Sequence, residues 1–199
     1  MKTTRKPPAA VLGACLVAIT LFSVPAYPQP PTAESPVLLT SCGQSPGPVM
    51  LKVILQKVGV PFELNPLATA ADLKAGKPYR SVIVVMGASL KGMGAAGISI
   101  DEEIARCGAL IEAARKCGLK VIGAHIEGMK RRSQGVSAGD TTDERSIDAV
   151  APVSDILLVN RDGDSDGRFT AISAAKGIPM ITVAKNLDLV EELRKLFGK

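Results

Sequence analysis

Aromatic residues are few in this sequence, with no Trp, two Tyr and four Phe among 199 residues. Proteins that bind nucleic acid need a basic surface and often stack bases on aromatic rings. The formal net charge is +5, and it falls to +2 once the three cations Lys2, Arg5 and Lys6 are set aside as part of a targeting segment. This near-neutral charge and the lack of stacking platforms predict that nucleic acid is not a partner.

Histidine and cysteine are also scarce. The single histidine, His125, cannot form the usual zinc site built from several histidines. Of the four cysteines, Cys42, Cys107 and Cys117 follow the N-terminal segment, so at least one of these three is unpaired within the chain. Cys107 and Cys117 are predicted on one helix, roughly 15 Å apart along its axis, which is too far to bridge. We therefore expect stability from a hydrophobic core.

The only long uncharged apolar run is at the N-terminus, over residues 9–24. It follows a basic stretch and ends at Val24-Pro25-Ala26, where Ala26 offers a small residue for cleavage. This layout predicts a secretory signal peptide over residues 1–26, followed by a Pro-rich linker over 27–35. We expect an exported protein, periplasmic or extracellular.

Two alternatives for this segment remain open. An uncleaved anchor is disfavoured because the apolar run has 16 residues, fewer than the roughly 20 that span a bilayer. The tetrapeptide Leu12-Gly-Ala-Cys15 resembles a lipoprotein cleavage box, although Cys15 lies inside the apolar run. Membrane contact is expected only through this segment, if it is uncleaved or lipidated.

Residues 36–199 alternate short β-branched runs with amphipathic stretches, six times over, which predicts βαβ units in one domain. The fold class is α/β: a three-layer, doubly wound, mostly parallel sheet, flavodoxin-like or Rossmann-like. We prefer strand order 2-1-3-4-5 with the sixth strand beside the fifth, and 3-2-1-4-5-6 is the alternative. The predicted strands are 37–41, 62–64, 81–86, 120–125, 155–160 and 179–183. The predicted helices are 49–58, 69–75, one capped by Ser99 and ending at Gly118, 143–150, 169–176 and 187–197.

Ligands of such sheets bind beyond the carboxyl ends of the strands. Four loops are predicted at that edge, and together they hold the histidine, a basic cluster, a Gly-rich stretch and an acidic stretch. The loops cover residues 41–48, 87–99, 125–141 and 160–168. This clustering indicates a binding site at the edge.

The Gly-rich loop contains Gly92-Met-Gly94-Ala-Ala-Gly97, which matches the G-x-G-x-x-G dinucleotide fingerprint. The glycines are predicted in mid-loop, well after the strand and before Ser99, and the nearest suitable acid is too distant along the chain. We therefore do not expect dinucleotide binding. Backbone amides of Gly92 and Gly94, with Ser89 and Lys91, can instead cradle an anionic group. The alternative is that the glycines serve only the turns.

The acidic loop places Asp162, Asp164 and Asp166 at the first, third and fifth positions of a calcium-loop pattern, with Gly167 at the sixth. The twelfth position is Ser173, so the bidentate glutamate is missing and an ordinary EF-hand is excluded. A weak calcium site is one hypothesis, and a solvated turn is the other. No other cofactor is expected.

His125 ends a predicted strand at the same edge, where it can act as a general base or contact a ligand. Cys42 precedes a helix N-terminus, which lowers the pKa of a thiol, and is therefore the candidate nucleophile. Structural roles for both residues are the alternatives, and an inert Cys42 is favoured. Lys130, Arg131 and Arg132 open a long loop that can close over an acidic ligand, or they form a solvated charge run.

The stretches PVLLTSCGQS, GASLKGMGAAGI and DGDSDGRFT resemble an uncharacterised family of exported bacterial α/β domains. The resemblance covers residues 35–199. Its most specific parts are Gly43-Gln-Ser45, the segment from Gly87 to Gly92, and Asp166-Gly167. It implies export and a Rossmann-like sandwich, and it implies no activity. It gives less weight to Cys42 and to calcium than to the polar residues Gln44, Ser45, Ser89 and Lys91 of the first two loops.

The sequence predicts an exported binding module for a small anionic molecule at the carboxyl edge of the sheet. A hydrolase or transferase using His125 as base at that edge is the second hypothesis, and a protein-interaction domain is the third. No oligomeric state is indicated. The predicted ligand-binding residues are Gln44, Ser45, Ser89, Lys91, Gly92, Gly94, His125 and Arg131.

Overall fold

The computed structural model describes residues 1, 30–74, 78–133 and 141–199. Apart from Met1, the predicted signal peptide lies outside them, as do residues 134–140 of the predicted 125–141 loop. A six-stranded sheet has the order β2-β1-β3-β4-β5-β6, and all neighbouring strands are parallel, so the preferred flavodoxin-like order is confirmed. Its strands are β1 (Val37–Cys42), β2 (Phe62–Leu64), β3 (Ser81–Met86), β4 (Lys120–His125), β5 (Ile156–Asn160) and β6 (Met180–Val183).

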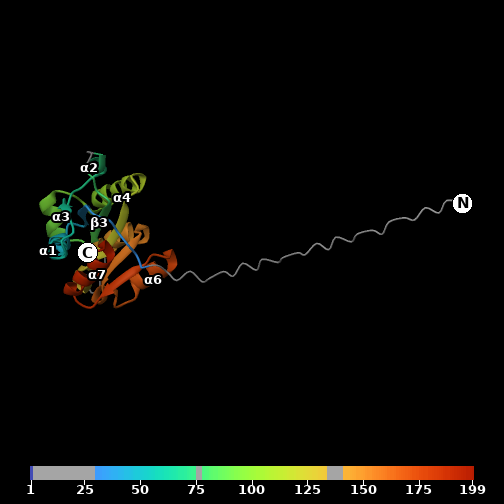
Figure 1. The fold of residues 1–199 in the computed structure, drawn as a ribbon. Helices are drawn as coiled ribbons and strands as arrows, with labels where there is room; N and C mark the ends of the chain where they lie inside the picture. Colours follow the sequence, from blue (N-terminus) through green and yellow to red (C-terminus); the bar gives the residue numbers. More distant parts are fainter. Residues whose placement is uncertain (2–29, 75–77, 134–140) are drawn as a thin grey trace.

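Helices cover both faces of this sheet, which gives the predicted three layers. Helices α1 and α7 pack on one face, while α2, α4, α5 and α6 pack on the other (Figure 1). The helices are α1 (Gly47–Val58), α2 (Ala70–Lys74), α3 (Leu90–Ala96), α4 (Ile100–Lys116), α5 (Thr142–Val150), α6 (Arg168–Lys176) and α7 (Leu189–Phe197). The described part of the chain also has short 3-10 helices in its loops: η1 (Gly128–Arg131), η2 (Ala151–Val153), η3 (Arg161–Asp164) and η4 (Asn186–Asp188).

The alternation of side chains along each strand supplies two separate cores. Leu39 and Ile83 face α1 and α7, while their neighbours Leu38 and Val84 face the helices of the opposite layer. All six residues of β3 are buried, as its apolar sequence SVIVVM predicts for a central parallel strand. The two cores hold the carboxyl ends of the strands in fixed positions, and the loops of the site begin there.

The long helix α4 begins as predicted, at the capping box of Ser99 and Glu102. Helical periodicity predicts a buried stripe of Ile100, Ile104, Cys107, Ile111 and Ala114 on this helix, and this prediction is partly wrong. Ile100 and Ile104 are only half-buried, and the fully buried positions are Glu103, Cys107, Leu110, Ile111 and Ala114. A carboxylate therefore takes a core position that hydrophobic periodicity assigned to isoleucine, because polar groups of the first loop require a partner there.

The prediction that the Gly-rich stretch is an open loop is wrong, because most of it forms helix α3. The hydroxyl of Ser89 accepts a hydrogen bond from the Gly92 amide and caps the helix, and Gly97 ends it in the left-handed conformation. A β-carbon on Gly92 would lie 2.1 Å from the carbonyl oxygen of Gln44. Gly92 therefore allows α3 to approach the first loop closely.

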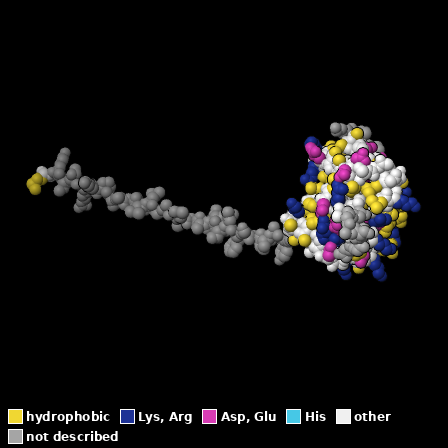
Figure 2. Space-filling view, turned by 180° about the vertical axis from the view of Figure 1, so that it is seen from behind, with side chains coloured by type: hydrophobic (Ala, Val, Ile, Leu, Met, Phe, Trp, Pro, Cys, Tyr) yellow, Lys and Arg dark blue, Asp and Glu magenta, His cyan; other side chains and the backbone are white. Residues whose placement is uncertain are grey.

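The packed domain begins within the stretch predicted as linker. The Ala33 amide donates to the carbonyl of Leu196 in α7 at 2.8 Å, and Ser81 donates to the carbonyl of Glu34 at 2.6 Å. Within the described residues, no helix is long and apolar enough to span a bilayer. On the face drawn in Figure 2, basic and acidic side chains are interspersed among apolar ones.

Candidate functional site

The loop after β1 is held tightly against the loop after β3. Gly43 has a φ of 109°, and a β-carbon there would lie 2.5 Å from the carbonyl oxygen of Gly87. Gln44 takes a left-handed φ of 54°, which is uncommon outside glycine, and forms an isolated β-bridge with Ala88. This places the two predicted anion-binding loops side by side.

A buried ion pair supports the first loop from below. Glu103 Oε1 accepts hydrogen bonds from the Gly43 amide and from Gln44 Nε2, both at 2.8 Å. Arg106 Nε donates to Glu103 Oε2 at 2.9 Å, and its Nη2 donates to the Ser41 carbonyl at 2.6 Å. The side chains of Glu103 and Arg106 are 0% and 9% exposed. Sequence reasoning missed both, since charged residues on an amphipathic helix are normally assigned to its solvated face.

The amides of the loop after β3 are also used inside the protein. The Gly87 amide donates to Ser146 Oγ at 2.8 Å, and the Ala88 amide donates to Asp143 Oδ1 at 2.6 Å. The Gly92 amide is taken by the Ser89 cap. These donors fix the loop and α3 in place, and the three amides already have acceptors.

Across the edge, Glu127 links the start of α1 to the loop after β4. The Gly47 amide donates to both Glu127 Oε2 at 3.0 Å and Ser45 Oγ at 3.3 Å. Arg131 Nε donates to Glu127 Oε1 at 3.1 Å, and its Nη1 donates to the Ala88 carbonyl at 3.0 Å. Arg131 is thereby held in one orientation with part of its guanidinium facing solvent.

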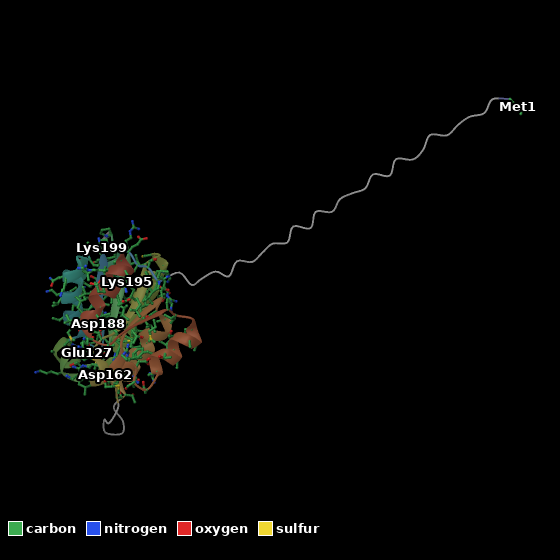
Figure 3. All side chains as sticks on the ribbon, turned by 60° about the horizontal axis from the view of Figure 1, so that its bottom comes forward. Met1, Glu127, Asp162, Asp188, Lys195 and Lys199 are labelled. Carbon is green, nitrogen blue, oxygen red and sulfur yellow. The ribbon has the colours of Figure 1, made fainter. Side chains whose placement is uncertain are left out.

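Beside this pair lies a groove of about 650 Å³ at the carboxyl ends of β4, β5 and β6. Figure 3 labels two of its acids, Glu127 and Asp162, which lie next to each other at this edge. We call it the edge groove. Its lining residues are Pro46, Met50, Ile126, Glu127, Gly128, Lys130, Arg131, Asn160, Asp162, Ala184 and Asn186.

Of the eight predicted ligand-binding residues, Arg131 alone lines the edge groove. Gln44 and Ser45 belong to the first loop, and Ser89, Lys91, Gly92 and Gly94 belong to the start and body of α3. Their ligand-binding roles stay predictions. The first loop and α3 form one part of the carboxyl edge, and Arg131 lies in the neighbouring part with the edge groove.

His125 lies in the interior instead of at the surface of the edge. It has no exposed area, stacks on Phe169, and its Nδ1 and Nε2 face the carbonyl oxygens of Met86 and Gly128 at 3.2 and 3.1 Å. Desolvation lowers the pKa of His125 below 6.5, although the two carbonyls oppose this. Within the described residues neither ring nitrogen is hydrogen-bonded to a serine or cysteine, so the geometry does not support His125 as a general base.

Cys42 is equally inaccessible. Its hydrogen bond with Cys107, followed by burial, raises the pKa of the Cys42 thiol well above its ordinary value. The prediction that the helix N-terminus lowers the pKa of Cys42 is therefore wrong. The alternative, that Cys42 is not a nucleophile in the folded protein, is favoured. Cys117 is exposed at the end of α4.

The three aspartates of the predicted calcium loop face different partners. Asp162 accepts from the Met129 amide at 2.9 Å, and Asp164 accepts from the Phe169 amide at 2.6 Å at the start of α6. Asp166 pairs with Arg132, whose hydrogen bonds lower the Asp166 pKa to about 2. Among the described residues no three His, Cys, Asp or Glu side chains are grouped to hold a metal ion. The geometry supports the structural turn.

Arg132 was predicted to belong to a basic lid or a solvated charge run, and the structure contradicts the solvated case. Its side chain is 2% exposed and pairs with Glu144 and Asp166, both at 2.7 Å. It also donates to the carbonyl of Gly163 and lies over the ring of Phe169. Arg132 therefore joins the loops after β4 and β5, a role that its sequence neighbours gave no sign of.

A parallel sheet with helices on both faces and a groove at its carboxyl edge defines a doubly wound α/β protein. The chain belongs to the family described as domain of unknown function DUF6305, whose model matches residues 34–197. This confirms the resemblance to an uncharacterised α/β family. No curated protein matches the sequence.

Two solved structures are similar to the chain at low identity. One is a psychrotrophic esterase, EstA, from Pseudoalteromonas sp., with 9% identity and a TM-score of 0.36, covering 81% of this chain and 96% of that one. The other is TesA, with 16% identity and a TM-score of 0.31, covering 73% and 77%. At these identities and TM-scores, the likeness gives no evidence about function.

Proposed function

We propose that the protein is an exported binding protein for a small organic anion, which it holds in the edge groove. The observation that carries this proposal is the groove itself, because its volume of about 650 Å³ suits a small ligand and its position follows the rule for open parallel sheets. Export rests on the predicted signal peptide.

Arg131 is the group that recognises the anion. Its Nε and Nη1 are fixed by Glu127 and the Ala88 carbonyl, and among the described residues no hydrogen bond involves its Nη2. A guanidinium that is already oriented gains a charge-assisted hydrogen bond to a carboxylate or phosphate at little entropic cost. Lys130, exposed beside it, adds a second positive charge at the groove.

The groove also holds the carboxylates of Glu127 and Asp162, which accept hydrogen bonds from Arg131 and from the Met129 amide. The apolar and amide part of the lining indicates an organic ligand instead of a bare inorganic ion. Pro46, Met50, Ile126 and Ala184 supply an apolar wall. Asn160 Nδ2 donates to Asn186 Oδ1, and Asn186 Nδ2 donates to the Ile126 carbonyl, both at 2.8 Å, so both amides are oriented. Apolar surface with a few oriented polar groups is typical of small-molecule sites.

Calorimetric titration with a panel of aliphatic carboxylates and phosphate esters tests the proposal. We expect one class to bind wild type, and Arg131→Gln to weaken it by about tenfold or more, the effect of losing one charge-assisted hydrogen bond. Lys91→Ala is the matched control, since it removes a cation of the same edge that does not line the groove. Binding that survives Arg131→Gln and disappears in Lys91→Ala would move the site to α3, and no binding by any member would reject the proposal.

A second candidate, a hydrolase or transferase, retains one supporting observation. Ser45 Oγ and Glu127 Oε2 accept from the same Gly47 amide at the start of α1, so a serine hydroxyl lies close to a carboxylate. A carboxylate can orient or deprotonate a serine nucleophile. Labelling with a fluorophosphonate probe tests this candidate, because it should modify wild type and leave Ser45→Ala unmodified. An unlabelled wild-type protein would eliminate Ser45 as a nucleophile.

A further inference from the structure

Two buried cysteines meet below the first loop of the site. Cys42 ends β1 and Cys107 lies in the middle of α4, and both have no exposed area and belong to the same core cluster. The Cys107 thiol donates to the carbonyl oxygen of Ser41, the neighbour of Cys42, at 3.3 Å. The side chains of the two cysteines are themselves hydrogen-bonded. Their sulfur atoms are therefore neighbours, although 64 residues separate the two positions in the chain.

The two thiols have different surroundings. Arg106 Nη2 donates a hydrogen bond to the Cys107 sulfur at 3.3 Å. The hydrogen bond of Cys42 with Cys107, together with burial, raises the pKa of the Cys42 thiol in the folded protein.

The surrounding contacts hold the strand end and the helix together. Glu103, one turn before Cys107, accepts from the amide of Gly43, which follows Cys42. Arg106 binds the carbonyl of Ser41, which precedes Cys42. Contacts on both sides of Cys42 thus fix its backbone against α4, and this keeps the two sulfur atoms near each other in the native fold.

We propose that Cys42 and Cys107 form a disulfide when the protein folds in the presence of a small-molecule disulfide such as oxidised glutathione. While the core is still open, the thiolate of one of the two cysteines attacks one sulfur of that disulfide, a mixed disulfide forms and one glutathione thiolate leaves. The other cysteine then loses its proton to solvent and attacks the protein sulfur of the mixed disulfide, displacing the second glutathione thiolate. Two protein thiols are oxidised, and one glutathione disulfide is reduced to two thiols.

This cross-link would join the end of β1 to α4 directly under the loop that carries Gln44 and Ser45. It closes a long loop, for which the stabilisation from a disulfide is expected to be large. Because both sulfur atoms are buried, we expect the exchange during folding, before the core closes. Cys117, exposed at the other end of α4, is left as a free thiol.

The test refolds the reduced, denatured protein with a mixture of reduced and oxidised glutathione. Free thiols are then alkylated in denaturant and the protein is digested for mass spectrometry. We expect a peptide containing Cys42 linked to a peptide containing Cys107 in most molecules, and a melting midpoint several degrees above that of the reduced protein. Cys117→Ser should retain the link, which excludes scrambling through the exposed thiol.

The outcome that overturns the proposal can be read from wild type alone, so it does not depend on whether a cysteine variant folds. Full alkylation of both Cys42 and Cys107 after oxidative refolding would show that they stay thiols. A link from either one to Cys117 would show that the neighbouring pair is not the preferred partner. Cys42→Ser and Cys107→Ser, where they fold, should each abolish the linked peptide. The remaining cysteine of the pair should then be alkylated.

Discussion

The carboxyl edge of the sheet has two halves that use polar residues in different ways. In the half formed by the β1 and β3 loops, Glu103, Arg106 and Gln44 bond to one another and to backbone groups inside the protein. In the half formed by the edge groove, Arg131 is 26% exposed and Lys130 faces solvent. The first half builds the shape of the edge, and the second half has donors left for a ligand.

The largest loss of stability is expected from Glu103→Ala. This substitution removes the carboxylate that accepts hydrogen bonds from the Gly43 amide, Gln44 and Arg106. Arg106 and the Gly43 amide would be left buried without it, and breaking a buried ion pair in this way costs about 3–5 kcal/mol. The free energy of unfolding from urea titration measures this. Glu112→Ala is the control on the same helix, because Glu112 pairs with Lys116 in an exposed position and its loss should cost much less than the loss of Glu103. Equal losses for the two variants would contradict the assignment.

The next prediction compares the stability effects of substituting two glycines of α3. Gly92→Ala places a β-carbon against the Gln44 carbonyl and should destabilise the protein by about 1–3 kcal/mol through overpacking. Gly94→Ala meets nothing within 4 Å and should be neutral or stabilising by up to about 1 kcal/mol, since alanine favours helix. Thermal unfolding of the two variants compares them. A stable Gly92→Ala protein would show that α3 does not pack closely on the first loop.

A smaller effect concerns pH and His125. Because the pKa of His125 is lowered in the folded protein, the unfolded chain binds a proton more readily, and stability should decline as pH falls below about 6.5. The contribution of the neutral His125 to stability is fully present above that pH. His125→Asn should flatten this part of the profile when urea unfolding is followed between about pH 7.5 and 5. An unchanged slope in the variant would assign the decline to other groups.

Most of the fold could be predicted because its signals are local. The run SVIVVM indicated β3, the Ser99 capping box indicated the start of α4, and Gly118 marked the end of that helix. Alternation of the elements then restricted the topology. Helix α3 was missed because two glycines among its seven residues argue against helix, and here a serine cap and close packing outweigh that preference.

The candidate site was predicted less completely because it depends on contacts between distant residues. The edge itself followed from the parallel sheet, and Arg131 was among its predicted residues. Glu103 was missed since its partners, Gly43 and Gln44, lie some 60 residues earlier. Asn186 and Ala184 follow β6, whose loop was not included in the predicted edge. No local pattern in the sequence reports which loop a side chain will face.

The buried position of Arg132 has a consequence for how this family can diversify. By joining Glu144, Gly163 and Asp166, it braces the loops after β4 and β5 into one rigid wall of the edge groove. Two other residues that line this groove, Met50 and Ala184, are exposed. Under the proposed function, substitutions at Met50 and Ala184 should alter ligand preference among relatives at small cost to stability, whereas substitutions of the buried Arg132 should be costly.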